Sequence, residues 1–223
     1  MAIPLLDAID IAGKVITGDA LLAQRALAKY LVEKRGAHYH FTVKANQPTL
    51  LSDIEFHFRN RAEPNYTDRA PLDHGRIETR KIWTTTELND YLDFPHVGQA
   101  FAIERHCIEK RTGKCSCEIA YGITSQTPLE ANAQSVLATN RAHWGIENSC
   151  HYVIDWNYDE DRSRIRTGYG PENITRLRRF AVGLIKSKGV PSVAQKMRQL
   201  TRNGRLVFDY LRMTKNSCGV LSL

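Results

Sequence analysis

The segment that decides the fold is KVITGDALLAQRALAKYLVEKRGAHYHFTVK, residues 14–44. Lys14–Thr17 is a short β-branched run, typical of a buried strand. Leu21–Arg35 carries apolar residues at helical spacing, and His38–Lys44 is the next strand-like run. A strand, a helix and a strand in this order predict two parallel strands joined by a helical crossover.

Polar residues follow both of these strands. Asp19 comes directly after the first strand, and Lys44, Asn46 and Gln47 close the second. Ligands of open sheets bind beyond the carboxyl ends of the strands, so these residues mark a candidate site. Asp19 has a second interpretation, as a turn residue at the strand end or as the N-cap of the helix that follows, because Asp is favoured at such positions.

The rest of the chain changes from β-rich to helical. A polar, proline-containing loop is expected over Arg61–Gly75, and a β-rich block between Gly75 and Thr124 is interpreted as an insertion into the α/β core. The strands and helices expected beyond the first unit are a helix at Thr49–Asn60, strands at Arg76–Thr84, Gln99–Lys110 and Cys115–Thr124, and helices at Pro128–Arg141, His143–Asp155, Asn173–Lys188, Ser192–Arg202 and Leu206–Met213.

Charge is distributed unevenly along the chain. The net charge is +7, but the part from Arg162 onward has 14 Lys+Arg against Glu172 and Asp209, which leaves 17 basic and 22 acidic residues before it. A terminal region of +12 beside a region of −5 favours a surface that binds a polyanion, with a solvated basic face as the alternative.

Composition excludes several protein classes. The 42% hydrophobic and 25% charged content is that of an ordinary globular protein, and no apolar run is long enough for a membrane helix. The first ten residues lack the pattern of a signal peptide, so an intracellular protein is expected. Five cysteines lack zinc-site spacing, and reduced structural thiols are favoured over a zinc site at Cys115 and Cys117 with His106.

A second candidate carboxylate is Glu147, on an expected helix behind His143 and Trp144 and before Asn148. If this helix packs near the end of the Asp19 strand, two carboxylates converge. Phosphodiester cleavage uses such groups, because Mg²⁺ binds oxygen ligands and two metals can serve the attacking and leaving oxygens. Taken alone, Glu147 is interpreted as a solvated helical position rather than as a metal ligand.

Several motifs together resemble insertion-sequence transposases of the DDE class, in particular the H-repeat-associated subgroup. The matching segments are Ile16–Ala20 (ITGDA), Val43–Leu50 (VKANQPTL), His74–Arg80 (HGRIETR), Arg141–Asn148 (RAHWGIEN) with His151, Tyr152 and Asp155, Glu160–Arg166 (EDRSRIR), and Asn173 with Arg178 and Arg179. The resemblance extends to about Lys188.

This resemblance implies an α/β fold, with an RNase H-like core that lacks its N-terminal part, a β-rich insertion and a basic α-helical C-terminal tail. The expected domains are 1–75 for the partial core, 76–124 for the insertion, 125–161 for the catalytic-helix part of the core, and 162–223 for the basic tail. Asp19 and Glu147 would be the second and third catalytic carboxylates and ligands of Mg²⁺ or Mn²⁺.

Two departures from the family pattern affect this inference. The broader family's Tyr, Arg and Lys positions around the catalytic Glu are Asn140, His143 and Ile154 here. The first catalytic Asp has no counterpart, since Asp7 and Asp10 lie in an expected helix; the chain is therefore expected to be truncated. A sheet edge exposed by the missing strands would favour a homodimer.

Residues expected to contact DNA lie around Glu147 and in the basic tail. Arginine suits phosphate because its planar fork binds two oxygens. The candidates are Arg141, His143, Trp144, Asn148, Arg162, Arg164, Arg166, Arg178 and Arg179, with His74, Arg76 and Arg80 as further candidates that a solvated hairpin edge explains equally well. Trp83 is interpreted as packed in the sheet rather than as a base-stacking residue.

The function expected from the sequence is that of a DNA transposase, which cuts and transfers insertion-sequence ends into target DNA by a two-metal mechanism. Its expected location is the cytoplasm of a prokaryote, in association with the nucleoid. The alternatives are a non-catalytic DNA-binding remnant or regulator, and a metal-dependent nuclease unrelated to an element.

Overall fold

The computed structural model describes residues 2–73, 76–146, 152–160 and 162–214. These divide into two compact units, Met1–His143 and Trp144–Leu223. The helix after the β-rich block belongs to the first unit, because it packs on the sheet of that unit.

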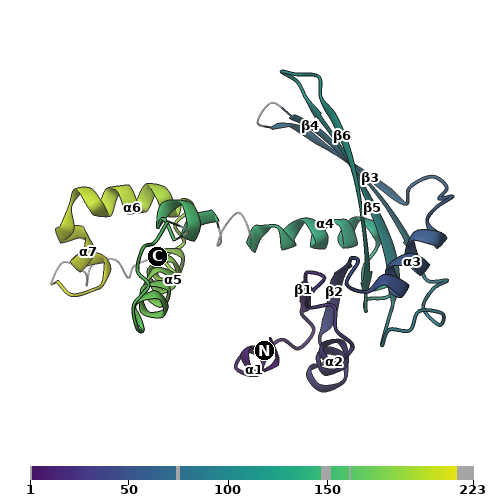
Figure 1. The fold of residues 1–223 in the computed structure, drawn as a ribbon, viewed down its shortest axis with the longest axis horizontal. Helices are drawn as coiled ribbons and strands as arrows, with labels where there is room; N and C mark the ends of the chain where they lie inside the picture. Colours follow the sequence, from purple (N-terminus) through teal and green to yellow (C-terminus); the bar gives the residue numbers. More distant parts are fainter. Residues whose placement is uncertain (1, 74–75, 147–151, 161, 215–223) are drawn as a thin grey trace. The chain divides into compact units, whose positions relative to one another are not determined.

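The first unit opens with a short helix, α1 (Ala2–Asp7), and a parallel strand pair. Strand β1 (Val15–Gly18) pairs in parallel with β2 (His38–Val43), with Val15 opposite His38 and Gly18 opposite Phe41. The connection between them is helical, as the sequence predicts (Figure 1).

The crossover helix begins later than predicted. It consists of α2 (Arg25–Lys29) continued by a π-helix, η1 (Tyr30–Lys34). Residues 19–24 instead form turns, in which the Leu22 amide donates to the Asp19 carbonyl oxygen at 3.0 Å and the Gln24 amide to that of Leu22 at 2.7 Å.

The strands of the described residues form one six-stranded sheet, in the order β1-β2-β6-β5-β4-β3. Strand β6 (Cys115–Thr124) lies between β2 and β5 (Gln99–Glu109) and is antiparallel to both. Strand β4 (Arg76–Thr85) lies on the other side of β5. The strands of residues 76–124, which were expected as an insertion, therefore continue the sheet that begins with β1 and β2 (Figure 1).

The prediction of a loop over Arg61–Gly75 was wrong, because Tyr66–Asp73 forms the edge strand β3. Its pairing with β4 shifts register between Ala70 and Asp73. Proline and polar residues are tolerated at a sheet edge, where one side of the strand has no neighbour to pair with, and they concealed the strand in the sequence.

Two apolar cores lie on opposite faces of the sheet. Helix α3 (Pro48–His57) packs in the core that contains Ala100 and Ala102, whereas α4 (Ala133–His143) packs in the core that contains Phe101 and Ile103. Alternate residues of β5 thus point to opposite faces, as a pleated strand requires. Figure 1 shows α3 and α4 on either side of the sheet.

The second unit is helical, as expected for the C-terminal region. It contains a π-helix, η3 (Val153–Asn157), and the helices α5 (Gly170–Lys186), α6 (Val193–Arg202) and α7 (Gly204–Tyr210). Its buried apolar side chains are Ile154, Val182, Ile185 and Val193. Among the described residues, no helix combines the length and apolar character needed to span a membrane.

Candidate active site

Asp19 lies at the end of β1 and is exposed. Its Oδ1 atom accepts hydrogen bonds from the Leu21 amide at 3.2 Å and the Leu22 amide at 3.3 Å. Asp19 is therefore a turn residue at the end of β1 and not the cap of the crossover helix, whose N-cap is Gln24. Because the carboxylate is also exposed at the carboxyl end of a parallel strand, it is placed where ligands of such sheets bind.

Asn46 and Gln47 hold the loop that follows Asp19. The Asn46 side-chain amide donates to the Ala20 carbonyl oxygen at 2.6 Å, and the Gln47 side-chain amide donates to that of Ala23. Both residues follow β2, so the turn after the second strand fixes the turn after the first. Lys44, the other candidate in this turn, is exposed.

The last turn of α4 lies beside β1. The His143 Nδ1 atom is 3.0 Å from Thr17 Oγ1, within hydrogen-bonding distance, and Thr17 is two residues before Asp19. Convergence of Asp19 and Glu147 would require this helical region to pack near the Asp19 strand, and the contact brings α4 to that strand as far as His143. Glu147 and Asn148 lie outside the described residues.

A buried histidine lies under this junction. His40 on β2 is 2% exposed and stacks on Phe101, with 4.7 Å between ring centroids. Its Nε2 atom is 3.5 Å from the Asn140 side-chain amide of α4. Burial, together with the charge of His143, lowers the pKa of His40 from 6.5 to about 3. The ring is therefore neutral at physiological pH.

Two arginines proposed as phosphate contacts are engaged within the fold. Arg141 forms an ion pair with Asp68 at 2.5 Å, and Arg80 pairs with Glu78 while remaining mostly buried. Arg76 is exposed, and His74 lies outside the described residues. Arg80 and Arg141 therefore contribute to packing between β3, β4 and α4.

Trp83 is packed in the sheet, as interpreted from the sequence. It is 8% exposed, its Nε1 atom donates to the Ala62 carbonyl oxygen at 2.7 Å, and the Arg61 guanidinium lies 4.6 Å from its ring centroid. An indole held in this way is not available to stack on a base.

The arginines proposed in the second unit are mostly solvent-accessible. Arg162 is 78% exposed and lies 3.6 Å from Asp159. Arg178 differs, because its Nη1 atom is buried and has no hydrogen-bond partner among the described residues. The remaining candidates, all exposed, are Trp144, Arg164, Arg166 and Arg179.

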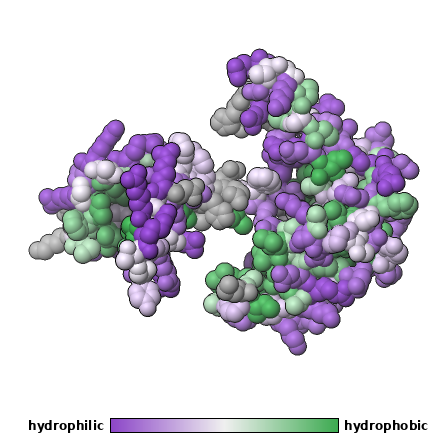
Figure 2. Space-filling view, viewed as in Figure 1, coloured by the Kyte–Doolittle hydropathy of each residue, from purple (hydrophilic) through white to green (hydrophobic). Residues whose placement is uncertain are grey.

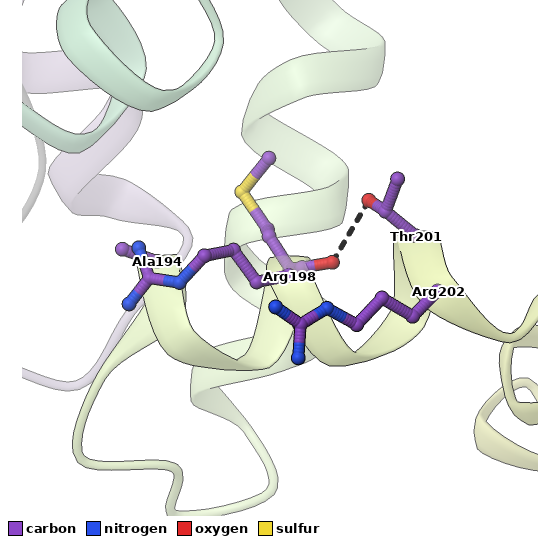
Figure 3. A pocket seen from close by; sticks show the side chains of 5 residues that line it. Ala194, Arg198, Thr201 and Arg202 are labelled. Carbon is purple, nitrogen blue, oxygen red and sulfur yellow. Dashed lines mark hydrogen bonds between the residues drawn. The ribbon is translucent and has the colours of Figure 1, made fainter.

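Helix α6 adds two cationic residues that the sequence analysis did not single out. Arg198 and Arg202, one helical turn apart, line an open hollow of about 300 Å³ with Ala194, Met197 and Thr201 (Figure 3). The i, i+4 spacing places both guanidinium groups on one face of the helix, and this spacing was a signal available in the sequence. Hydrophilic side chains cover much of the visible surface of this unit (Figure 2).

Comparisons with known proteins identify the family. Residues 1–174 match the model of the transposase DDE domain. The chain is 31% identical over 197 residues to the Escherichia coli O157:H7 protein named putative transposase YncI, covering 83% of this chain and 49% of that protein. It is 28% identical over 211 residues to the H repeat-associated putative transposase YhhI of Escherichia coli K12, covering 89% and 55%.

The chain spans about half the length of the curated relatives it matches. The family match nevertheless extends over most of its residues, including both β1 and α4. The mixed α/β fold, with a six-stranded sheet and several helices, is consistent with that match. The chain belongs to the family of transposases with a DDE domain.

Proposed function

We propose that Asp19 and Glu147 are two of the metal-binding carboxylates of a DNA transposase, and that the basic second unit binds the DNA. The observation that carries this proposal is the contact between His143 and Thr17. It ties the end of α4 to the strand that leads to Asp19. Glu147 is four residues beyond His143, and four residues span at most about 14 Å.

The donor chemistry at Asp19 fits a hard divalent cation. Asp19 offers an exposed carboxylate, which Mg²⁺ and Mn²⁺ favour over nitrogen or sulfur ligands. Asp19 and Glu147 would hold the metal, which supplies activation of an attacking oxygen and stabilisation of the leaving oxygen of a phosphodiester. Asn46 and Gln47 would keep the Asp19 loop in place through their bonds to Ala20 and Ala23.

The proposed substrate is DNA, at the ends of an insertion sequence and at its target. The second unit has 14 Lys+Arg and 7 Asp+Glu, whereas the first has 17 of each, so the second unit carries the whole net charge of +7. Exposed arginines such as Arg162 and Arg198 are placed to neutralise phosphates. Phosphate contacts of this kind dominate the affinity for DNA.

The test is nicking of supercoiled plasmid in the presence of Mg²⁺ or Mn²⁺. Asp19→Asn keeps the Oδ1 acceptor for the Leu21 and Leu22 amides but removes the negative charge. Since a metal ion contributes several kcal/mol to such reactions, we expect Asp19→Asn and Glu147→Gln each to lower the nicking rate about a hundredfold or more.

Asp10→Asn is the matched control. Asp10 Oδ1 accepts from the Ala12 amide at 3.2 Å, in the same kind of turn as Asp19, so its replacement should leave nicking unchanged. Nicking that survives Asp19→Asn would refute the catalytic assignment. DNA retention without nicking would instead identify a binding protein without catalysis, and equal cleavage of terminal repeats and random duplex would identify a general nuclease.

A further inference from the structure

The hairpin formed by β5 and β6 brings three side chains with metal-binding atoms together. His106 and Cys117 are directly opposite each other across the two strands, and Glu104 is two residues before His106 on the same face of β5. One ligand atom from each of the three lies within 4.8 Å of the others. Asp19 does not belong to this cluster.

Within the cluster, the potential ligand atoms of the three side chains lie close to one another. The His106 Nε2 atom is 2.6 Å from Glu104 Oε1 and 3.7 Å from Cys117 Sγ. The Glu104 side chain is 13% exposed, that of His106 is 45% exposed, and Cys117 is exposed. The cluster thus has a partly buried carboxylate at its base and two accessible ligands above it.

We propose that Glu104, His106 and Cys117 form a binding site for Zn²⁺ or a similar transition metal. Zn²⁺ favours tetrahedral sites of sulfur, nitrogen and carboxylate ligands, whereas Mg²⁺ and Ca²⁺ favour oxygen alone. Three protein ligands leave a fourth position for water, as in open zinc sites. The ligand set therefore selects a different metal from the one proposed at Asp19.

The surroundings of Glu104 leave one oxygen available. Arg61 forms an ion pair with Glu104 through Oε2, and Oε1 is the atom that faces His106. Lys81 Nζ is 4.0 Å from the same Oε1 atom. The two cationic side chains oppose a purely electrostatic attraction for cations. Arg61 and Lys81 therefore weaken the binding of hard cations such as Mg²⁺ more than the binding of a metal that forms strong bonds to thiolate and imidazole.

The strand register fixes this arrangement without a bound ion. Antiparallel pairing places opposite side chains about 5 Å apart, and alternate residues of one strand share a face. Cys115 shares that face with Cys117 but lies opposite Ile108, and Cys107 points to the other face of β5. These two cysteines, both reduced, are internal controls on the same hairpin.

Alkylation of the full chain tests the site. Iodoacetamide labelling with and without equimolar Zn²⁺ is measured for each cysteine by peptide mass spectrometry. We expect Zn²⁺ to slow the labelling of Cys117 about tenfold or more while Cys115 stays as reactive as before, and Mg²⁺ to protect neither. Equal protection of Cys115 and Cys117, or protection of neither, would overturn the proposal.

Cobalt titration provides a second readout that does not depend on activity. Bound Co²⁺ should give a thiolate charge-transfer band in the wild type and in Cys115→Ser, and no such band in Cys117→Ser. His106→Gln should weaken Co²⁺ binding about tenfold or more. A band that persists in Cys117→Ser, or binding unaffected by His106→Gln, would contradict the assignment. Circular dichroism of each variant checks that the sheet is retained.

Discussion

At the scale of single residues, Asn46 connects two turns that would otherwise be independent. Its side chain donates to the Ala20 carbonyl oxygen at 2.6 Å, one residue after Asp19. Asn46→Ala leaves that acceptor without its partner, so we expect the free energy of unfolding to fall by about 1 kcal/mol, as measured by urea denaturation. The exposed neighbour Lys44→Ala should change it by less than about 0.5 kcal/mol, and an equal loss in both would argue against the bond.

His40 makes the stability of the first unit sensitive to acid. Its pKa is about 3 in the folded chain and near 6.5 when unfolded. Below pH 6.5 the unfolded chain therefore binds a proton that the folded chain does not. Stability is unaffected by this group above that pH and falls as the pH drops from 6.5 towards 3, by up to about 1.4 kcal/mol per pH unit.

His40→Phe isolates this contribution, since a phenyl ring can replace the imidazole against Phe101. We expect the variant to lose less stability than the wild type between about pH 7 and pH 5, in urea denaturation at each pH. Parallel pH profiles for the two proteins would show that His40 does not remain neutral in the folded chain.

The polar residues after the two strands were predictable, but their partners were not. The sequence identifies the strand ends at Asp19, Asn46 and Gln47, because the apolar run before each stops abruptly. Which carbonyl group each amide meets depends on how the two turns face one another in space. The same limit applied to His106 and Cys117, whose pairing depends on the register of β5 and β6.

At the scale of elements, Gly122 allows β6 to fit between its neighbours. A Cβ atom at this position would lie 2.2 Å from the Phe101 side chain and 2.6 Å from the Phe41 carbonyl oxygen. Overpacking of this kind typically costs 1–3 kcal/mol, so we expect Gly122→Ala to destabilise the sheet by about 2 kcal/mol or more in thermal denaturation.

Gly183 in α5 is the contrasting position. A Cβ atom there would meet nothing within 4 Å, and its φ is not positive, so Gly183→Ala should stabilise that helix by about 0.5–1 kcal/mol. Destabilisation by both substitutions to the same degree would mean that packing around Gly122 is not the cause of its effect.

Elements with a strong local pattern were predicted well. The bounds of β6 agree with the prediction. Its strand-like run of residues is bounded by a hairpin turn on one side and by a proline-containing loop on the other. The start of α2 was misplaced because Leu22, which fits the helical spacing, is 39% exposed in a turn, where its amide bonds to Asp19. The connection of β6 to β2 was not predictable, since pairing between distant strands leaves no local signal.

At the scale of the whole molecule, the two compact units differ in net charge. The first unit balances 17 basic and 17 acidic residues, and many are paired within it, as Arg141 is with Asp68. The second unit has twice as many basic as acidic residues. Binding to DNA should therefore depend on the second unit, because the release of counterions from phosphates scales with the number of cations that reach them.

This difference gives a prediction for the isolated first unit, residues 1–143, which contains both apolar cores of the sheet. We expect the fragment to fold, by circular dichroism, and to bind duplex DNA at least tenfold more weakly than the full chain at low salt. In the full chain, Arg198→Gln and Arg202→Gln should each reduce the slope of log K against log salt by about 0.9, whereas Arg25→Gln, paired with Asp93, should not. A folded fragment that keeps the affinity and salt dependence of the full chain would locate DNA binding on the first unit rather than on α6.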